Sequence, residues 1–253
     1  MPLVSILIPT YNRANLIHRA IDSALAQTFR DFEIVIVDNC STDNTLDILL
    51  EYERKLPEII RVFQNSENLG PVMNWKKCAS LAKAPFCKVI FSDDMIQNDY
   101  LEKTVPEIIN PNCGLVYTPA IVGFIDWEGA THYKAFQNNT HINRDNFIRL
   151  TTLLEHFCPV SPGAALFRTI DLQEAIFSHI SGIDYDFSGT GAGVDWLIYP
   201  LIALKYKYVS YVSDSLVYFH AHNDSISIKN ENSSIPLGYA LAKKWLTESV
   251  PGI

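Results

Sequence analysis

The chain has 253 residues, 48% of them hydrophobic and 19% charged, so it can bury a sizeable core and suits one large α/β domain or one domain with a small appendage. Its formal net charge of −8 argues against a protein that coats nucleic acid. No apolar run approaches the length of a membrane span, and the first residues lack the features of a signal peptide. The five cysteines are scattered without a CxxC pair, which favours reduced thiols in a cytoplasmic protein.

The first 110 residues alternate between short β-rich runs and amphipathic segments. Strands are predicted at residues 4–9, 32–37, 60–63 and 86–91, and helices at residues 15–26, 46–55 and 73–82. Such alternation is typical of βαβ units, in which helices connect parallel strands. The sequence therefore predicts an α/β fold with a Rossmann-like, mostly parallel central sheet flanked by helices on both faces.

After residue 110 the pattern becomes less regular. Strands are predicted at residues 113–120, 121–126, 164–167, 206–212 and 215–219, and helices at residues 144–156, 195–204 and 237–246. The polar stretch 132–144 is predicted to be a flexible loop, and the glycine-containing run 188–193 a hinge-like loop. The helix at 237–246 carries an apolar stripe that includes Tyr239 and Trp245, which we expect to pack on the body of the protein or on another surface.

Two adjacent carboxylates, Asp93 and Asp94, end the predicted strand at residues 86–91. In α/β sheets the carboxyl ends of the strands are where ligands bind. Two acids at this place suggest a divalent metal that holds a phosphorylated substrate. The alternative is a turn, because Ser-Asp-Asp also begins loops and caps helices.

The segment after the first strand combines an aromatic ring, an amide and a guanidinium group. These groups belong to the run Pro9, Thr10, Tyr11, Asn12 and Arg13. They are suited to stacking on a nucleobase and contacting phosphate. A turn whose Asn caps the next helix explains the same residues equally well.

Other acids and two histidines also follow predicted elements. Asp38 ends the second strand, where a carboxylate accepts hydrogen bonds from a ribose hydroxyl or a base N–H, although it also suits a turn. Asp195 begins a helix, where an acid is also a favourable partner of the helix dipole. Side chains alternate along a strand, so His220 and His222 are predicted on the same face of the strand. One of them is suited to binding a metal, and the alternative is a structural role for both.

These segments, in this order, resemble the family 2 glycosyltransferases, which share the GT-A fold. The likeness runs through Val4–Arg13, Gln27–Phe29, Asp31–Asp38, Ser41–Asp43, Asn68–Gly70, Asn74–Trp75, Ser92–Asp94, Ser161–Arg168, Val194–Asp195 and His222–Ser227. It implies a nucleotide-sugar-binding half at residues 1–110, an acceptor-binding and catalytic half with a smaller acceptor-side region at 111–230, and a C-terminal helical segment at 231–253.

The resemblance also implies a metal-dependent, inverting transfer of a sugar from a UDP-, dTDP-, CDP- or GDP-sugar to a hydroxyl of a glycan or lipid-linked acceptor, in cell-surface polysaccharide synthesis. The implied general base is Asp195, and the implied ligands of Mn²⁺ or Mg²⁺ are Asp94 and His222. The implied donor-binding residues are Pro9, Thr10, Tyr11, Asn12, Arg13, Asp38, Asn68, Gly70, Asn74 and Asp93. Many relatives have Arg in place of His220. A neutral His binds a diphosphate less strongly than a charged Arg does.

Two other functions are compatible with the sequence. One is a catalytically silent module that binds nucleotide-sugars or glycans. The other is a sugar-phosphate nucleotidyltransferase, which needs a glycine- and basic-rich phosphate loop that Pro9–Asn12 lacks. We expect a cytoplasmic location, with peripheral contact at the inner face of the membrane as the alternative for a lipid-linked acceptor.

Overall fold

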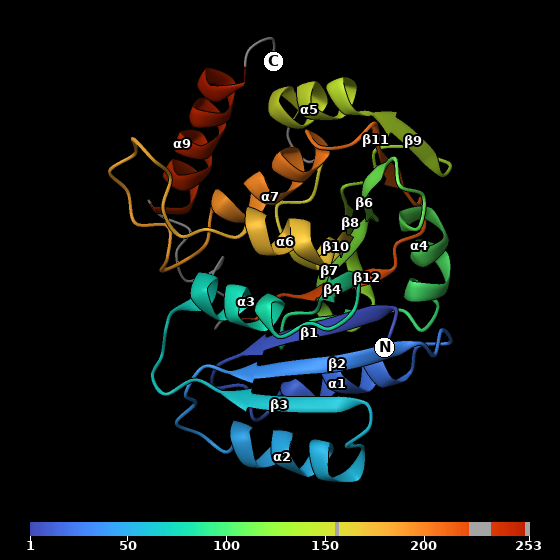
Figure 1. Cartoon of the computed structure of the whole chain (residues 1–253), viewed down its shortest axis with the longest axis vertical. Helices are drawn as coiled ribbons and strands as arrows, with labels where there is room; N and C mark the ends of the chain where they lie inside the picture. Colours follow the sequence, from blue (N-terminus) through green and yellow to red (C-terminus); the bar gives the residue numbers. More distant parts are fainter. Residues whose placement is uncertain (155–156, 223–233, 251–253) are drawn as a thin grey trace.

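The computed structural model describes residues 1–154, 157–222 and 234–250 (Figure 1). The helices are α1 (Ile17–Leu25), α2 (Thr45–Lys55), α3 (Pro71–Ser80), α4 (Tyr100–Ile108), α5 (Arg144–Leu153), α6 (Thr169–Ala175), α7 (Val194–Ala203) and α9 (Ser234–Ser249), with a 3-10 turn, η1, at Pro162–Ala164. The strands are β1 (Val4–Thr10), β2 (Phe32–Asp38), β3 (Ile60–Gln64), β4 (Phe86–Val89), β5 (Met95–Ile96), β6 (Cys113–Tyr117), β7 (Ala120–Ile125), β8 (Glu128–His132), β9 (Thr140–Asn143), β10 (Ala165–Arg168), β11 (Tyr208–Tyr211) and β12 (Val217–His220).

The larger sheet has eight strands in the order β3-β2-β1-β4-β10-β6-β11-β9. Strands β3, β2, β1 and β4 are parallel neighbours, as are β6 and β11. Strand β10 is antiparallel to both β4 and β6, and β9 is antiparallel to β11. Six of the eight strands therefore run in one direction, which confirms the mostly parallel sheet.

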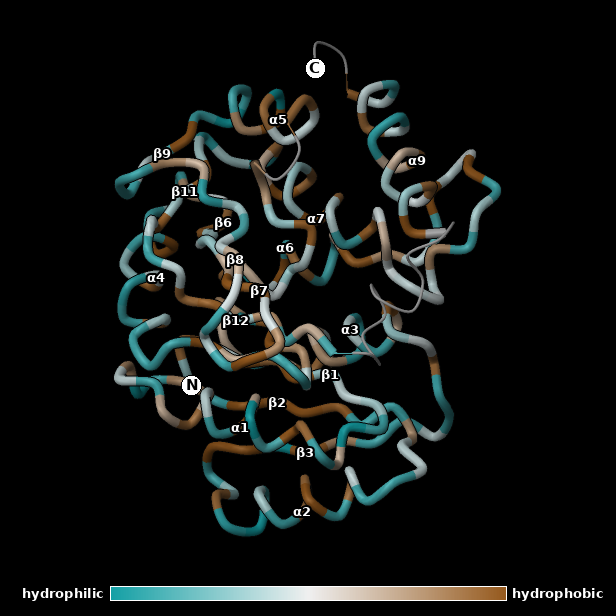
Figure 2. The backbone as a smooth tube through the Cα atoms, turned by 180° about the vertical axis from the view of Figure 1, so that it is seen from behind, coloured by the Kyte–Doolittle hydropathy of each residue, from teal (hydrophilic) through white to brown (hydrophobic). Residues whose placement is uncertain are grey.

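Both faces of this sheet are buried, because side chains alternate along each strand. On β1, Ile6 and Ile8 belong to one core cluster, which also includes residues of α1, α2 and α4. Leu7 belongs to the other cluster, with residues of α3, α5, α6, α7 and α9. Figure 2 shows the brown, apolar strands at the centre of the molecule. Two cores on one sheet explain why β1 and β2 are almost continuously apolar.

A second sheet of four strands, in the order β5-β12-β7-β8, lies beside the carboxyl end of β4. Strand β12 pairs with β5, and the backbone N–H of His220 donates to Asp94 Oδ1 at 3.1 Å. This small sheet therefore brings the end of β12 to the acids that follow β4.

Parts of the structure after β4 differ from the sequence prediction. Helices α4 and α6 were not predicted. Residues 132–144 are not one irregular loop, because β8 reaches His132 and β9 pairs with β11 at the edge of the larger sheet. On β9 only Ile142 is buried, since an edge strand with one buried face needs few apolar residues.

Helix α9 lies beside α7, at the end of the molecule opposite α2 (Figure 1). Ala242 and Leu246 are fully buried, and Tyr239 and Trp245 are partly buried against the same core. The apolar stripe of this helix thus packs on the body of the protein. Within the described residues, we find no helix whose length and apolar character would allow it to cross a membrane. The five cysteines are all free.

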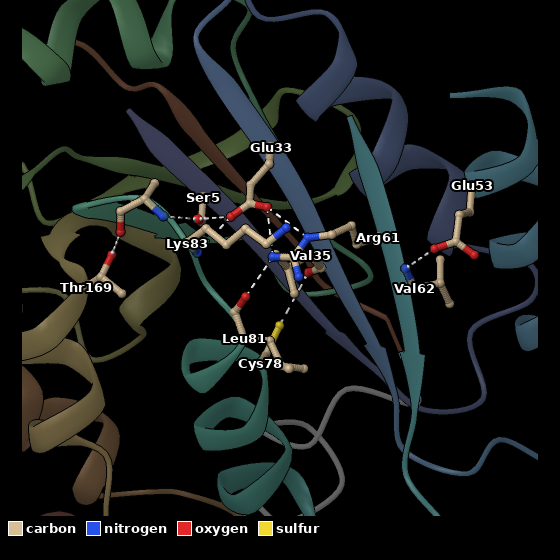
Figure 3. A network of polar contacts seen from close by, with 11 residues as sticks. Ser5, Glu33, Val35, Glu53, Arg61, Val62, Cys78, Leu81, Lys83 and Thr169 are labelled. Carbon is tan, nitrogen blue, oxygen red and sulfur yellow. Dashed lines mark hydrogen bonds and ion pairs between the residues drawn. The ribbon is translucent and has the colours of Figure 1, made fainter. Parts of the chain in front are cut away.

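A buried carboxylate, Glu33, connects the strands at the amino end of the sheet (Figure 3). Its Oε1 accepts from the Ser5 hydroxyl at 2.6 Å and from the Lys83 backbone N–H at 2.8 Å. Its Oε2 accepts from Arg61 Nε at 2.9 Å, and Arg61 Nη2 also donates to the Leu81 carbonyl at 2.7 Å. The network therefore joins β1, β2, β3 and the segment before β4.

Replacement of Glu33 by Ala is expected to lower the free energy of unfolding by about 3–5 kcal/mol, because it leaves the Arg61 charge and two donors unpaired. Urea unfolding of both proteins measures the loss. The matched control is Glu51→Ala, which removes a carboxylate whose ion pair with Lys55 is largely exposed and should leave stability unchanged. Equal stability of Glu33→Ala and the wild type would contradict this role.

Candidate active site

A cavity of about 630 Å³ opens at the carboxyl edge of the parallel strands. Its walls come from the segments after β1 and β4, the start of α3, the second sheet, the start of α7 and helix α9. The predicted site residues that line it are Pro9, Thr10, Tyr11, Arg13, Asn68, Asn74, Asp93, Asp94 and Asp195. The predicted residues outside this lining are Asn12, Asp38, Gly70 and His222.

Two polar groups at and just after the end of β1 have no hydrogen-bond partner among the described residues. Thr10 Oγ1 and Arg13 Nε are buried and make no hydrogen bond within the described part of the chain. The Arg13 guanidinium lies 4.0 Å from the Asp93 carboxylate. Buried donors without a partner are costly, so these two groups are suited to a polar ligand in the cavity.

Asp38 is fully buried at the end of β2 and bonds within its own loop. It accepts from the Ser41 backbone N–H at 3.0 Å, from the Ser41 hydroxyl and from Gln64 Nε2 at 3.1 Å. Asn12 similarly accepts from the Thr42 backbone N–H at 2.8 Å. Both side chains shape the loops beside the cavity, and their contacts with a donor stay predictions.

Four amide side chains form a connected network behind the cavity. Asn39 Nδ2 donates to Asn68 Oδ1 at 2.8 Å, and Asn65 Nδ2 donates to Asn39 Oδ1 at 2.9 Å and to Asn74 Oδ1 at 3.0 Å. Asn68 Oδ1 also accepts from the Gly70 backbone N–H at 2.9 Å. The network fixes the turn before α3 against the end of β2. Asn39 lines the cavity and was not predicted, although it follows Asp38 directly.

Asp94 is 8% exposed and lines the cavity. Burial raises the pKa of its carboxyl group well above the usual value, and the neighbouring charge of Asp93 raises it further. Hydrogen bonding from the His220 N–H and the charges of Lys88 and Arg19 oppose this rise. Asp93 Oδ2 lies 2.8 Å from His222 Nε2. The ring of His222, which stacks on the ring of His220, therefore lies against Asp93.

The two acids fit a divalent cation that a ligand helps to bind. Among the residues that the structure describes, no group of three or more His, Cys, Asp or Glu side chains has the arrangement of a complete metal site. Mg²⁺ is usually held by only one or two carboxylates together with substrate phosphates. The buried Asp94 beside Asp93 supplies that kind of incomplete site, since a cation would neutralise their repulsion.

Asp195 lies in the first turn of α7 and is 9% exposed. Its Oδ1 accepts from the backbone N–H groups of Gly193 at 2.8 Å and Trp196 at 2.7 Å. Its Oδ2 accepts from the Tyr239 hydroxyl at 2.9 Å. Burial raises the pKa of this carboxyl group to about 7, and the hydrogen bonds oppose the rise. A carboxylate with this pKa is well suited to accept a proton near neutral pH.

The sequence model described as Glycosyl transferase family 2 matches residues 5–174 of the chain. The chain belongs to glycosyl transferase family 2. The putative teichuronic acid biosynthesis glycosyltransferase TuaG of Bacillus subtilis is 37% identical over 117 residues, which are 46% of each chain. The chondroitin synthase of Escherichia coli is 36% identical over 107 residues, which are 42% of this chain and 15% of the synthase. The matches thus span less than half the length of these two relatives.

Solved structures of glycosyltransferases share the fold of this family 2 chain. Staphylococcus aureus TarS 1–349 in complex with UDP-GlcNAc has a TM-score of 0.71 and 23% identity, over 90% of this chain and 61% of that one. The mannosyltransferase PcManGT of Pyrobaculum calidifontis, in complex with GDP-Man and Mn²⁺, has a TM-score of 0.59 and 15% identity, over 97% of this chain and 69% of that one. These likenesses confirm the GT-A fold.

The structure also adds cavity residues that the sequence did not reveal in this family 2 chain. Tyr239 was assigned only to an apolar stripe, yet its hydroxyl reaches Asp195. Trp75 and Tyr133 also line the cavity, and Tyr133 has a left-handed backbone conformation, with φ of 62°, that is rare for an aromatic residue. Trp75 belongs to the Asn74–Trp75 motif of the family resemblance, whereas no local signal distinguishes Tyr133 and Tyr239 from core residues. The predicted motif residues 223–227 lie outside the described part of the chain.

Proposed function

We propose that this chain is a metal-dependent, inverting glycosyltransferase that moves a sugar from a nucleotide-sugar to a hydroxyl of a glycan or lipid-linked acceptor. Relatives named for teichuronic acid biosynthesis and chondroitin synthesis support a role in cell-surface polysaccharide synthesis. The neighbours in complex with UDP-GlcNAc and GDP-Man support a nucleotide-sugar donor. A lipid-linked acceptor would bring the enzyme to the membrane surface.

The observation that carries this proposal is the combination of groups around one cavity. The carboxylate of Asp195, the acid pair Asp93 and Asp94, and the unpartnered groups of Thr10 and Arg13 all line it. A direct displacement at the anomeric carbon needs a base on one side and a stabilised leaving group on the other. The reaction therefore inverts the configuration of that carbon.

The proposed roles follow from charge and position. Asp195 removes the proton from the attacking hydroxyl, which otherwise is a poor nucleophile. Asp94 and His222 would hold Mn²⁺ or Mg²⁺, and His222 lies beside Asp93. The bound ion would stabilise the negative charge of the leaving diphosphate. Asp93 is assigned to the ribose side of the donor, and Arg13 to its phosphates.

The remaining predicted residues are assigned to the shape of the donor pocket. Pro9, Thr10 and Tyr11 border it directly. The groups that act through their loops are Asn12, Asp38, Asn68, Gly70 and Asn74. On this proposal residues 1–110 bind the donor and residues 111–230 bind the acceptor, with Tyr133 and Thr190 at the acceptor side of the cavity.

A thermal-shift screen of UDP-, GDP-, CDP- and dTDP-sugars, each with and without Mn²⁺, tests the donor proposal. A ligand that binds only the folded chain raises its unfolding temperature. We expect one nucleotide to stabilise the protein, and Mn²⁺ to increase the effect. Magnesium-free buffer with EDTA serves as the control for the metal.

The ligand found in the screen is then incubated with candidate glycan acceptors, and the product is identified by mass spectrometry. Transfer with inversion supports the enzyme. Binding without transfer or donor hydrolysis would favour a silent binding module, and formation of a nucleotide-sugar from a sugar phosphate would favour a nucleotidyltransferase. Absence of any nucleotide-sugar binding would contradict the proposal.

A further inference from the structure

We propose that Tyr239 is a positioning residue for the base, Asp195. The Tyr239 hydroxyl occupies one of the lone-pair positions of the Asp195 carboxylate, so that the last open position faces the hydroxyl of the acceptor substrate. The inference rests on the proposed function, in which Asp195 takes the proton of the acceptor hydroxyl. It makes helix α9 a functional part of the active site. Residue Tyr239 lies well beyond residues 5–174, which the family model matches.

The hydrogen bonds around Asp195 leave little freedom for the incoming hydroxyl. A carboxylate has two oxygens and about four acceptor positions. The N–H groups of Gly193 and Trp196 both donate to Oδ1, and the hydroxyl of Tyr239 donates to Oδ2. Among the described residues, these bonds fill about three of the four positions. The acceptor position that is left lies on Oδ2 of Asp195. Asp195 and Tyr239 both line the cavity, so a hydroxyl bound there can reach this position.

The backbone of α9 holds this phenol in place. A Cβ atom added to Gly238 would lie 2.3 Å from the carbonyl oxygen of Ala192, and one added to Gly193 would lie 2.4 Å from the carbonyl oxygen of Gly238. Only glycine allows so close an approach at both positions. Ala242, one turn along α9, is fully buried against the same core. The residue before Tyr239 therefore rests directly on the segment that begins the helix of Asp195.

The phenol of Tyr239 remains a donor at every working pH. Burial raises the pKa of Tyr239 far above its usual value, and the charge of Asp195 raises it further. The other titratable groups that face Asp195 are Tyr133, from the segment after β8, and Tyr199, on α7. The charged or titratable groups elsewhere on the cavity wall are Tyr11, Arg13, Asp93, Asp94, His132 and His220.

Replacement of Tyr239 by Phe removes the hydroxyl and keeps the ring. A hydrogen bond to a charged group stabilises the ionised form of Asp195, so its loss should move the acid limb of the pH–rate profile upward by about one pH unit. At pH 7 the ionised fraction of Asp195 then falls from about one half to about one tenth, so we expect release of nucleoside diphosphate, with the donor found by thermal shift, to slow about fivefold. The KM for the donor should stay within about twofold, because Tyr239 acts through the base.

A second readout needs no substrate. Because the folded pKa of Asp195 is raised to about 7, the stability of the wild type relative to Asp195→Asn should fall as pH rises from about 4 and level off near pH 7. In the Tyr239→Phe background the same difference should level off about one pH unit higher. If Tyr239→Phe does not fold, Tyr239→Met takes its place. The matched control is Tyr206→Phe, which removes a hydroxyl that donates to Asp171 at 2.6 Å outside the cavity, and it should shift neither profile.

The outcomes separate this inference from the proposed function. If the Asp195→Asn protein releases nucleoside diphosphate and transfers the sugar as fast as the wild type, the assignment of Asp195 as the base fails, and the role of Tyr239 fails with it. If Asp195→Asn is inactive while Tyr239→Phe keeps the wild-type rate and acid limb, only the role of Tyr239 is overturned. An equal loss of rate at every pH, with an unmoved acid limb, would also overturn the role of Tyr239, because that result is expected of a residue that only stabilises the structure.

Discussion

Replacement of Asp195 by Asn is expected to lower the rate of sugar transfer by about 10²–10⁴-fold while the donor still binds. The amide cannot take the proton of the acceptor hydroxyl, but its shape matches the carboxylate. Its oxygen can still accept from the N–H groups of Gly193 and Trp196. Its Nδ2 group can donate to the Tyr239 oxygen, which reverses the direction of the bond in the wild type. The variant should therefore fold normally.

Transfer rates across pH 5–9, together with donor-induced thermal shifts, measure this effect. The wild-type rate should rise with pH through about 7, because burial raises the pKa of Asp195 to about 7 and only the ionised form is a base. The Asp195→Asn rate should show no such rise. Asp145→Asn is the matched control, since Asp145 holds the corresponding position in the first turn of α5 and is exposed. Full transfer by Asp195→Asn would refute the base assignment.

Replacement of Asp94 by Asn is expected to abolish the part of donor binding that depends on Mn²⁺. A neutral amide is a poor ligand for a divalent cation, and Asp94 supplies the buried charge of the acid pair. Transfer should fall by at least about 10²-fold, because a metal ion contributes several kcal/mol to stabilising charge in the transition state. Calorimetric titration of the donor, with and without Mn²⁺, measures the change.

Asp93→Asn is the informative comparison for the assignment of the two acids. Asp93 is assigned to the ribose, so its replacement should weaken donor binding by a similar factor with and without Mn²⁺. The Asp145→Asn protein should bind like the wild type under both conditions. If Asp93→Asn loses the Mn²⁺ effect and Asp94→Asn keeps it, the two roles are exchanged.

Much of the part of the cavity that residues 1–110 build was predictable from local patterns. The alternation of apolar strands and amphipathic helices predicts parallel strands, and parallel strands bring their carboxyl ends to one edge. Polar residues directly after such strands must therefore gather there. Arg13 after β1 and the acids Asp93 and Asp94 after β4 meet in the cavity for this reason.

The part of the cavity that comes from residues after 110 depended on contacts between residues far apart in the chain. His220 meets Asp94 across 126 residues because β12 pairs with β5, and Tyr239 meets Asp195 across 44 residues because α9 rests on the segment before α7. The reversed strand β10 enters the sheet between β4 and β6. No short-range periodicity encodes such pairings, since they arise from the packing of whole elements.

The acid pair Asp93–Asp94 and the acid Asp195 were visible in the sequence because each interrupts or begins a regular apolar element. The amino-acid sequence by itself determined the fold class, the first strands in chain order and the acids next to regular elements, since these depend on local spacing. Only the tertiary structure decided what surrounds the acids. Burial sets the pKa of Asp195, and the partner that orients its carboxylate, Tyr239, is supplied by a helix whose own pattern indicates only a buried face.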